Sequence, residues 1–127
     1  MKFAVFGNRS IKDFATIYEA LDSVLTNETA LTYLHGGADG PAKLVADFAK
    51  ETGWIDVVIF KPWHMVWSKI TFDRTLFFMR NKQIIDNADK IFIFTNGDKD
   101  SEVTRVKDYC DKNKINYEFI EVVTNAD

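Results

Sequence analysis

The sequence has little cysteine, proline or histidine: its 127 residues include one cysteine, two prolines and two histidines. A single cysteine, Cys110, excludes an internal disulfide and a metal site built from several cysteines. The histidines, His35 and His64, lie far apart in the chain, so neither a metal site nor a cofactor is expected. Cysteine scarcity also favours a reducing compartment, and we expect a cytoplasmic protein.

Long hydrophobic runs are absent as well. No apolar stretch reaches the roughly 20 residues that a membrane-spanning helix requires, so no membrane partner is expected. The apolar part of the N-terminal "MKFAVFGNRS" is too short for a signal peptide.

Neither sign of charge dominates: 16 basic and 19 acidic residues give a net charge of −3. This balance provides no broad basic surface and argues against nucleic acid as a partner. The segment 61–82 differs, because it carries one acidic residue and five basic ones, Lys61, Lys69, Arg74, Arg80 and Lys82. It is either a solvated loop and helix face or a local anion site.

Apolar runs alternate with segments of 3.6-residue period, which predicts alternating strands and helices. Strands are expected at Lys2–Phe6, Leu31–His35, Asp56–Phe60, Lys90–Thr95 and Asn116–Val122, and helices at about Asp13–Thr26, Pro41–Thr52, Asp73–Asn87 and Glu102–Asn113. Because the strands are almost continuously apolar, both faces of the sheet should be buried. The pattern predicts a single α/β domain over residues 1–127, with a five-stranded, mostly parallel sheet covered by helices on both faces in three layers.

Right-handed crossovers place every strand-to-helix loop at one edge of such a sheet, where ligands bind at the point of strand-order reversal. Four segments should therefore meet there: "GNRS", "HGGADG", residues 61–73 and "NGDKDS". In the first, Gly7 permits a tight turn, and Asn8, Arg9 and Ser10 offer donors. Its single glycine excludes both common glycine-rich phosphate motifs. The alternative is a polar turn in which Ser10 or Asp13 caps the next helix.

Three glycines precede the second helix, Gly36, Gly37 and Gly40. Glycine permits positive φ and close approach of the backbone to a ligand, and a helix N-terminus favours phosphate. Asp39 would repel a phosphate placed directly beside it. The alternative is a tight turn with Asp39 as the N-cap, Pro41 in the first turn and Gly53 as the C-terminal stop.

Further along, Arg80 and Asn81 either reach the site to hold phosphate and ribose or belong to a charged surface. Trp63 either stacks on a base or packs over the core. We expect His35 to be a structural histidine with its hydrogen bonds satisfied.

The order of "FGNRS", "HGGADGPAKLVADFA", "FKPW", "RN" and "ADKIFIF" resembles the SLOG superfamily over roughly Lys2 to Tyr117. This Rossmann-like group includes LOG phosphoribohydrolases and the DprA DNA-processing proteins, and the small YspA-like nucleotide-binding branch is most similar. The resemblance implies ligand-binding roles for Gly7, Asn8, Arg9, Gly36, Gly37, Ala38, Gly40, Arg80, Asn81, Ser101 and Thr104. The chain departs from the family pattern at Ala42, where an acidic residue is usual, and at Val103, where glycine is usual.

The resemblance and the glycines favour a protein that binds a nucleotide or a related phosphorylated ligand, as a sensor or a sequestering protein. The first alternative is a hydrolase of N-glycosidic bonds in nucleoside monophosphates, with Glu102 as the catalytic carboxylate; the absent P-G-G-x-G-T signature argues against it. The second is an oligomeric interaction module built on Trp54, Trp63, Trp67, Phe77 and Phe78. The family often self-associates, so a homo-oligomer is expected. A small chain of this kind also fits an accessory protein of a phage or mobile element.

Overall fold

The computed structural model describes residues 1–27, 30–60 and 74–122, with the side chains of Ser23, Asn27 and residues 74–77 left aside. The elements follow in the order β1 (Lys2–Gly7), α1 (Phe14–Asn27), β2 (Leu31–His35), α2 (Pro41–Thr52), β3 (Ile55–Ile59), α3 (Arg74–Asn87), β4 (Lys90–Thr95), α4 (Ser101–Lys112) and β5 (Glu118–Glu121). All four strand pairs are parallel, and the sheet order is β3-β2-β1-β4-β5. The predicted α/β class and five-stranded sheet are confirmed.

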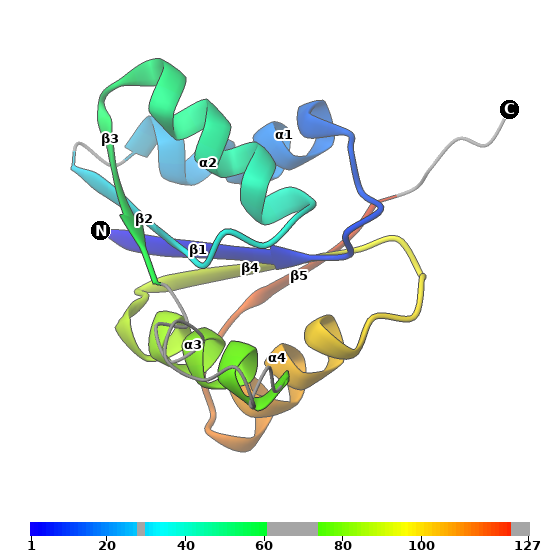
Figure 1. The fold of residues 1–127 in the computed structure, drawn as a ribbon. Coiled ribbons are helices and arrows are strands. Elements are labelled where there is room, and N and C mark those ends of the chain that lie inside the picture. The colour runs from blue at the N-terminus through cyan, green and yellow to red at the C-terminus, as the bar shows by residue number, and fades with distance from the viewer. Residues whose placement is uncertain (28–29, 61–73, 123–127) are drawn as a thin grey trace, which may run out of the picture.

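Helices cover both faces of the sheet, as predicted: α1 and α2 lie on one face, and α3 and α4 on the other (Figure 1). Alternation along β1 serves both layers, because Phe3 and Val5 pack under α1 and α2 while Ala4 and Phe6 face α3 and α4. None of the helices in the described ranges is long and apolar enough to cross a membrane.

Element boundaries follow the sequence pattern closely where the apolar run is clear. The observed bounds of β2, α2 and β4 are those predicted. Strand β3 begins one residue earlier than expected, at Ile55, and β5 is shorter, at Glu118–Glu121. The last segment, residues 116–122, is paired over only four residues, because it lies at the edge of the sheet beyond β4.

The N-cap of α2 and the start of α4 differ from those predicted. The N-cap of α2 is Gly40, which makes no side-chain cap bond, so the prediction that Asp39 caps it is wrong. The expected Pro41 and Gly53 signals are confirmed, since Pro41 opens α2 and Gly53 closes it at a φ of 73°. Helix α4 begins at Ser101, one residue before the expected start at Glu102, and Asp100 is its N-cap.

Candidate functional site

Strand order reverses between β1 and β4, so the loop after β1 and the loop after β4 meet at the carboxyl edge of the sheet. Asn8, which is only 1% exposed, joins the two loops. Its Nδ2 donates to the Asp98 carbonyl at 3.1 Å, and its Oδ1 accepts the Asn96 N–H at 3.0 Å. Asn8 therefore holds the two loops together from the interior of the protein.

A second layer of bonds lies nearer the surface of the same two loops. The Ser10 hydroxyl donates to Asp98 Oδ2 at 2.6 Å and accepts from Asn96 Nδ2 at 2.7 Å. Asn96 Oδ1 in turn accepts the Asp98 N–H at 3.0 Å. These bonds fix both loops as one rigid edge.

A hollow of about 720 Å³ opens beside this edge, a size that suits a small-molecule ligand. It lies over the ends of β1 and β4 and beside α3 and α4. Its lining consists of Asn8, Arg9, Ser10, Phe78, Asn81, Asp98, Lys99, Asp100, Ser101, Glu102 and Arg105.

The cations and the carboxylates of this hollow differ in how they are engaged. Arg9, Lys99 and Arg105 are exposed, and none forms an ion pair within residues 1–27, 30–60 and 74–122. The carboxylates bond within the protein. For example, Asp100 Oδ1 caps α4 by accepting the N–H groups of Glu102 at 2.9 Å and of Val103 at 3.4 Å. Three cationic side chains therefore line the hollow without an ion pair among the described residues, beside the carboxylates of Asp98, Asp100 and Glu102.

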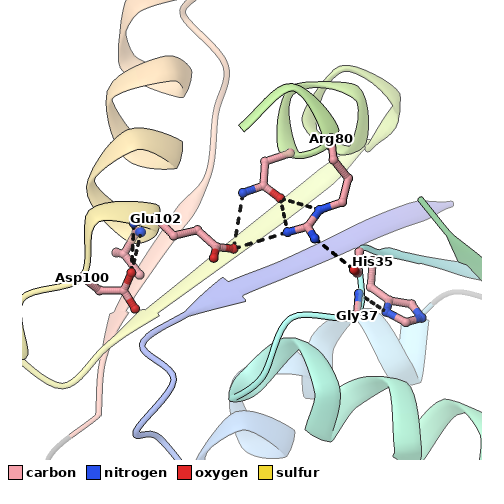
Figure 2. Close-up of polar contacts among 8 residues, drawn as sticks. His35, Gly37, Arg80, Asp100 and Glu102 are labelled. Carbon is pink, nitrogen blue, oxygen red and sulfur yellow. Dashed lines mark hydrogen bonds and ion pairs between the residues drawn. The ribbon is translucent and has the colours of Figure 1, made fainter. Parts of the chain in front are cut away.

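Behind the hollow, Arg80 lies in the interior at 5% exposure (Figure 2). Its Nη1 donates to the Gly36 carbonyl at 3.0 Å, and its Nε and Nη2 donate to Asn81 Oδ1 at 3.3 and 3.0 Å. Its Nη2 also lies 3.8 Å from Glu102 Oε1, which accepts from Asn81 Nδ2 at 3.3 Å. Burial lowers the pKa of Arg80, and the Glu102 carboxylate opposes that shift. Arg80 thus ties the loop after β2 to the first turn of α4.

The three glycines after β2 are each explained by the fold itself. A Cβ on Gly36 would overlap the Arg80 guanidinium, and Gly37 has a φ of 79°, which favours glycine. At Gly40 the φ is 88°, and a Cβ would lie 2.8 Å from the Asn8 carbonyl oxygen. Close packing at Gly36 and Gly40 and positive φ at Gly37 and Gly40 are sufficient reasons for this glycine-rich turn, and its role in ligand binding stays a prediction.

The sequence-predicted site residues divide between the hollow and its surroundings. Asn8, Arg9, Asn81, Ser101 and Glu102 line the hollow. A second, shallower hollow of about 740 Å³ on the other side of the α4 N-terminus includes Ser101 and Thr104. Neither lining includes the backbone positions Gly7, Gly36, Gly37, Ala38 and Gly40 or the buried Arg80. Trp63 lies outside the described residues.

The structure also describes three other residues singled out in the sequence, His35, Gly7 and Glu102. His35 is buried at 6% exposure and accepts the Gly37 N–H on Nδ1, which confirms a satisfied structural histidine. A Cβ on Gly7 would lie 2.6 Å from Pro41 Cγ, so that glycine allows β1 and α2 to meet. The Oε1 atom of Glu102 contacts Asn81 and Arg80. Its role as a catalytic carboxylate stays a prediction.

Sequence reasoning missed part of the hollow, notably Phe78, Lys99 and Arg105. The loop "NGDKDS" lies at the edge of the sheet as predicted, and its Lys99 is a further lining residue. Arg105 had a usable signal: it follows Ser101 by four residues on the same helix, so both side chains share one face.

The two departures from the family pattern lie toward the core. Ala42 is 5% exposed, and its carbonyl accepts the Tyr33 hydroxyl at 2.7 Å. Val103 is 7% exposed and packs in the core cluster beneath α4. Both side chains are buried here, and neither lines the first hollow, although Val103 lines the second.

The aromatic residues expected to mediate self-association are only partly described. Trp54 is 48% exposed, whereas Phe78 is half-buried and packs edge-on against Tyr109 at 6.3 Å. Trp63, Trp67 and the side chain of Phe77 lie outside the described part. The homo-oligomer stays a prediction.

The fold and the hollow define a parallel α/β protein whose site lies at the reversal of strand order. The chain belongs to the YspA, cpYpsA-related SLOG family (YAcAr), whose profile matches residues 1–65. The predicted membership of the SLOG superfamily is thereby confirmed. No curated protein matches the chain.

Among solved structures, the chain is similar to DNA processing protein A from Helicobacter pylori, described for its unique mode of binding single-stranded DNA. The TM-score is 0.68 at 17% identity, over 100% of this chain and 67% of that chain. Identity this low shows a shared fold alone. The prediction from net charge that nucleic acid is not a partner is nevertheless contradicted, because a protein of this fold binds single-stranded DNA. Net charge was a poor guide, since a local cluster of cations can bind phosphate on an acidic chain.

Proposed function

We propose that this protein binds a nucleotide-type ligand through its phosphate, in the hollow where the loops after β1 and β4 meet. The observation that carries the proposal is the convergence of Arg9, Lys99 and Arg105 on one hollow without an ion-pair partner among the described residues. Guanidinium groups bind phosphate oxygens through paired, charge-assisted hydrogen bonds. Asn81 also lines the hollow, but it is 2% exposed and its amide bonds to Arg80 and Glu102, so it supports the wall of the proposed site.

The loop geometry supports the same proposal, because binding is strongest where the receptor is already ordered. The bonds of Asn8 and Ser10 to Asp98 join the loop that carries Arg9 to the loop that carries Lys99 before any ligand arrives. Arg105 projects from the first turns of α4, which Asp100 fixes by capping. Little conformational entropy would remain to be lost from the backbone on binding.

Arg9→Ala and Arg105→Ala are each expected to weaken nucleotide binding by about tenfold to a hundredfold, since a hydrogen bond to a charged group contributes roughly 1.5–3 kcal/mol. The measurement is calorimetric titration with AMP, ADP-ribose and NAD after a thermal-shift screen. Lys12→Ala is the matched control, because Lys12 is an exposed cation of the same loop outside the hollow. Equal losses in all three variants would mean that only net charge matters, and unchanged binding in both arginine variants would refute the site.

Single-stranded nucleic acid is the second candidate ligand. The two hollows share Asp98, Lys99, Asp100, Ser101 and Arg105, so together they follow the N-terminus of α4. An exposed aromatic residue, Phe119, lies in the second hollow at 42% exposure, and aromatic side chains stack on bases. The similar fold of the DNA-binding protein from Helicobacter pylori adds to this candidate.

Titration with oligothymidylates of increasing length separates the two candidates. A strand-binding groove predicts affinity that rises with length until the groove is filled and that falls steeply with salt. A mononucleotide site predicts no gain beyond one or two nucleotides. Arg105→Ala should weaken binding in either case, because Arg105 lines both hollows.

A further inference from the structure

His35 ends β2 beneath the glycine-rich turn and is linked to that turn by one hydrogen bond (Figure 2). Its Nδ1 accepts the Gly37 N–H at 3.0 Å, and its ring stacks on Tyr33 with centroids 5.3 Å apart and an interplanar angle of 8°. An imidazole can accept this bond only when Nδ1 carries no proton. The neutral ring, protonated on Nε2, is therefore the form that this turn requires.

The same turn is connected to the hollow by a short chain of contacts. Gly36, the residue between His35 and Gly37, presents its carbonyl to Arg80 Nη1 at 3.0 Å. Arg80 and Asn81 then reach Glu102 in the wall of the hollow. A change in the backbone at Gly36 and Gly37 would therefore change the positions of the Asn81 and Glu102 side chains through Arg80.

Protonation of His35 would remove the acceptor and place two N–H groups against each other at Gly37. Burial lowers the pKa of His35, and the positive charges of Lys50 on α2 and Arg80 on α3 lower it further. Asp47 on α2 opposes them. A histidine so placed stays neutral at neutral pH and gains its proton only below the ordinary histidine pKa of 6.5.

We propose that His35 makes the binding site pH-sensitive: when it gains a proton, the Gly37 bond breaks, the turn shifts, and Arg80 no longer holds Asn81 and Glu102 in the geometry that binds ligand. This inference rests on the proposed function for its effect on affinity. The coupling between His35 and Arg80 is a property of the protein alone.

The first experiment needs no ligand. A ¹⁵N NMR titration from about pH 8 to pH 5 follows the Gly37 amide and the Arg80 Nε–H in the full chain. Both signals are expected to shift with one midpoint, equal to that of the His35 ring, and to be insensitive to His64→Asn. An Arg80 Nε–H that does not follow the His35 midpoint would overturn the inference, whether or not any ligand binds.

Two substitutions at the same position sharpen the result. In His35→Asn the side-chain oxygen replaces Nδ1 as acceptor but cannot be protonated, so the Arg80 signal should become independent of pH. His35→Phe keeps the stacking on Tyr33 but has no acceptor, so its Arg80 signal should resemble that of the acidic wild type at every pH. A titration that persists in His35→Asn would contradict the inference.

Binding forms the second experiment, with ADP-ribose and oligothymidylate as probes because their phosphodiester charges do not change over this range. In the wild type, affinity should fall by up to tenfold per pH unit below the His35 midpoint, the limit for one linked proton. In His35→Asn it should stay constant. No binding of either probe at any pH would refute the proposed function while the NMR result still decides the coupling. Binding with the same pH profile in both proteins would overturn the regulatory role.

Discussion

Replacing Gly40 by alanine is expected to lower the free energy of unfolding by about 3 kcal/mol, because two penalties combine at this position. The backbone there has φ 88° and ψ −143°, a region that side chains avoid. A Cβ would also lie 2.8 Å from the Asn8 carbonyl oxygen and 2.9 Å from Arg9 Cα, both backbone atoms that cannot rotate away. Urea denaturation monitored by circular dichroism measures the loss.

Gly53→Ala is the matched control for this prediction. Gly53 has a similar φ of 73° at the end of the same helix, but a Cβ there would meet nothing within 4 Å. It should therefore cost only the left-handed backbone penalty of about 1 kcal/mol. Equal losses in the two variants would show that backbone conformation alone accounts for the loss of stability at Gly40. The close approach of α2 to the loop after β1 would then contribute nothing.

The success of the sequence analysis at the level of the fold has a local cause. Strands β2 and β4 are continuous apolar runs, and α2 has a proline at its start and a left-handed glycine at its end. Each signal is contained within a few residues and needs no knowledge of partners. Parallel order and the position of the binding edge then follow from alternation and crossover handedness.

The site could be predicted only in part, because its decisive contacts join residues distant in the chain. The Gly36 carbonyl and Arg80 are separated by 44 positions, and Asn8 and Asp98 by 90. Sequence alone shows a glycine, an arginine and an asparagine, each as compatible with ligand binding as with packing. Gly36, which admits the Arg80 side chain, is therefore equally compatible in the sequence with a phosphate-binding turn.

Arg80→Ala is expected to lower the free energy of unfolding by about 3 kcal/mol, the lower end of the cost of removing one partner of a buried ion pair. Arg80 is 5% exposed, and its loss leaves the Gly36 carbonyl without that donor and Glu102 without its charge partner. The lower end applies because the Glu102 side chain is 22% exposed, so water can hydrate it. The exposed Gln83 of the same helix provides the control, since Gln83→Ala should change stability by less than about 0.5 kcal/mol.

A double-mutant cycle tests whether the contact between Gly36 and Arg80 is the cause. Gly36→Ala alone should destabilise the protein, because its Cβ would occupy the space of the guanidinium. In the Arg80→Ala background the same substitution should cost little, since that space is then empty, so the two losses should add up to more than the loss in the double variant. Strict additivity would mean that contact with Arg80 is not the reason for glycine at position 36. Close approach of a ligand to the turn would then become the better explanation.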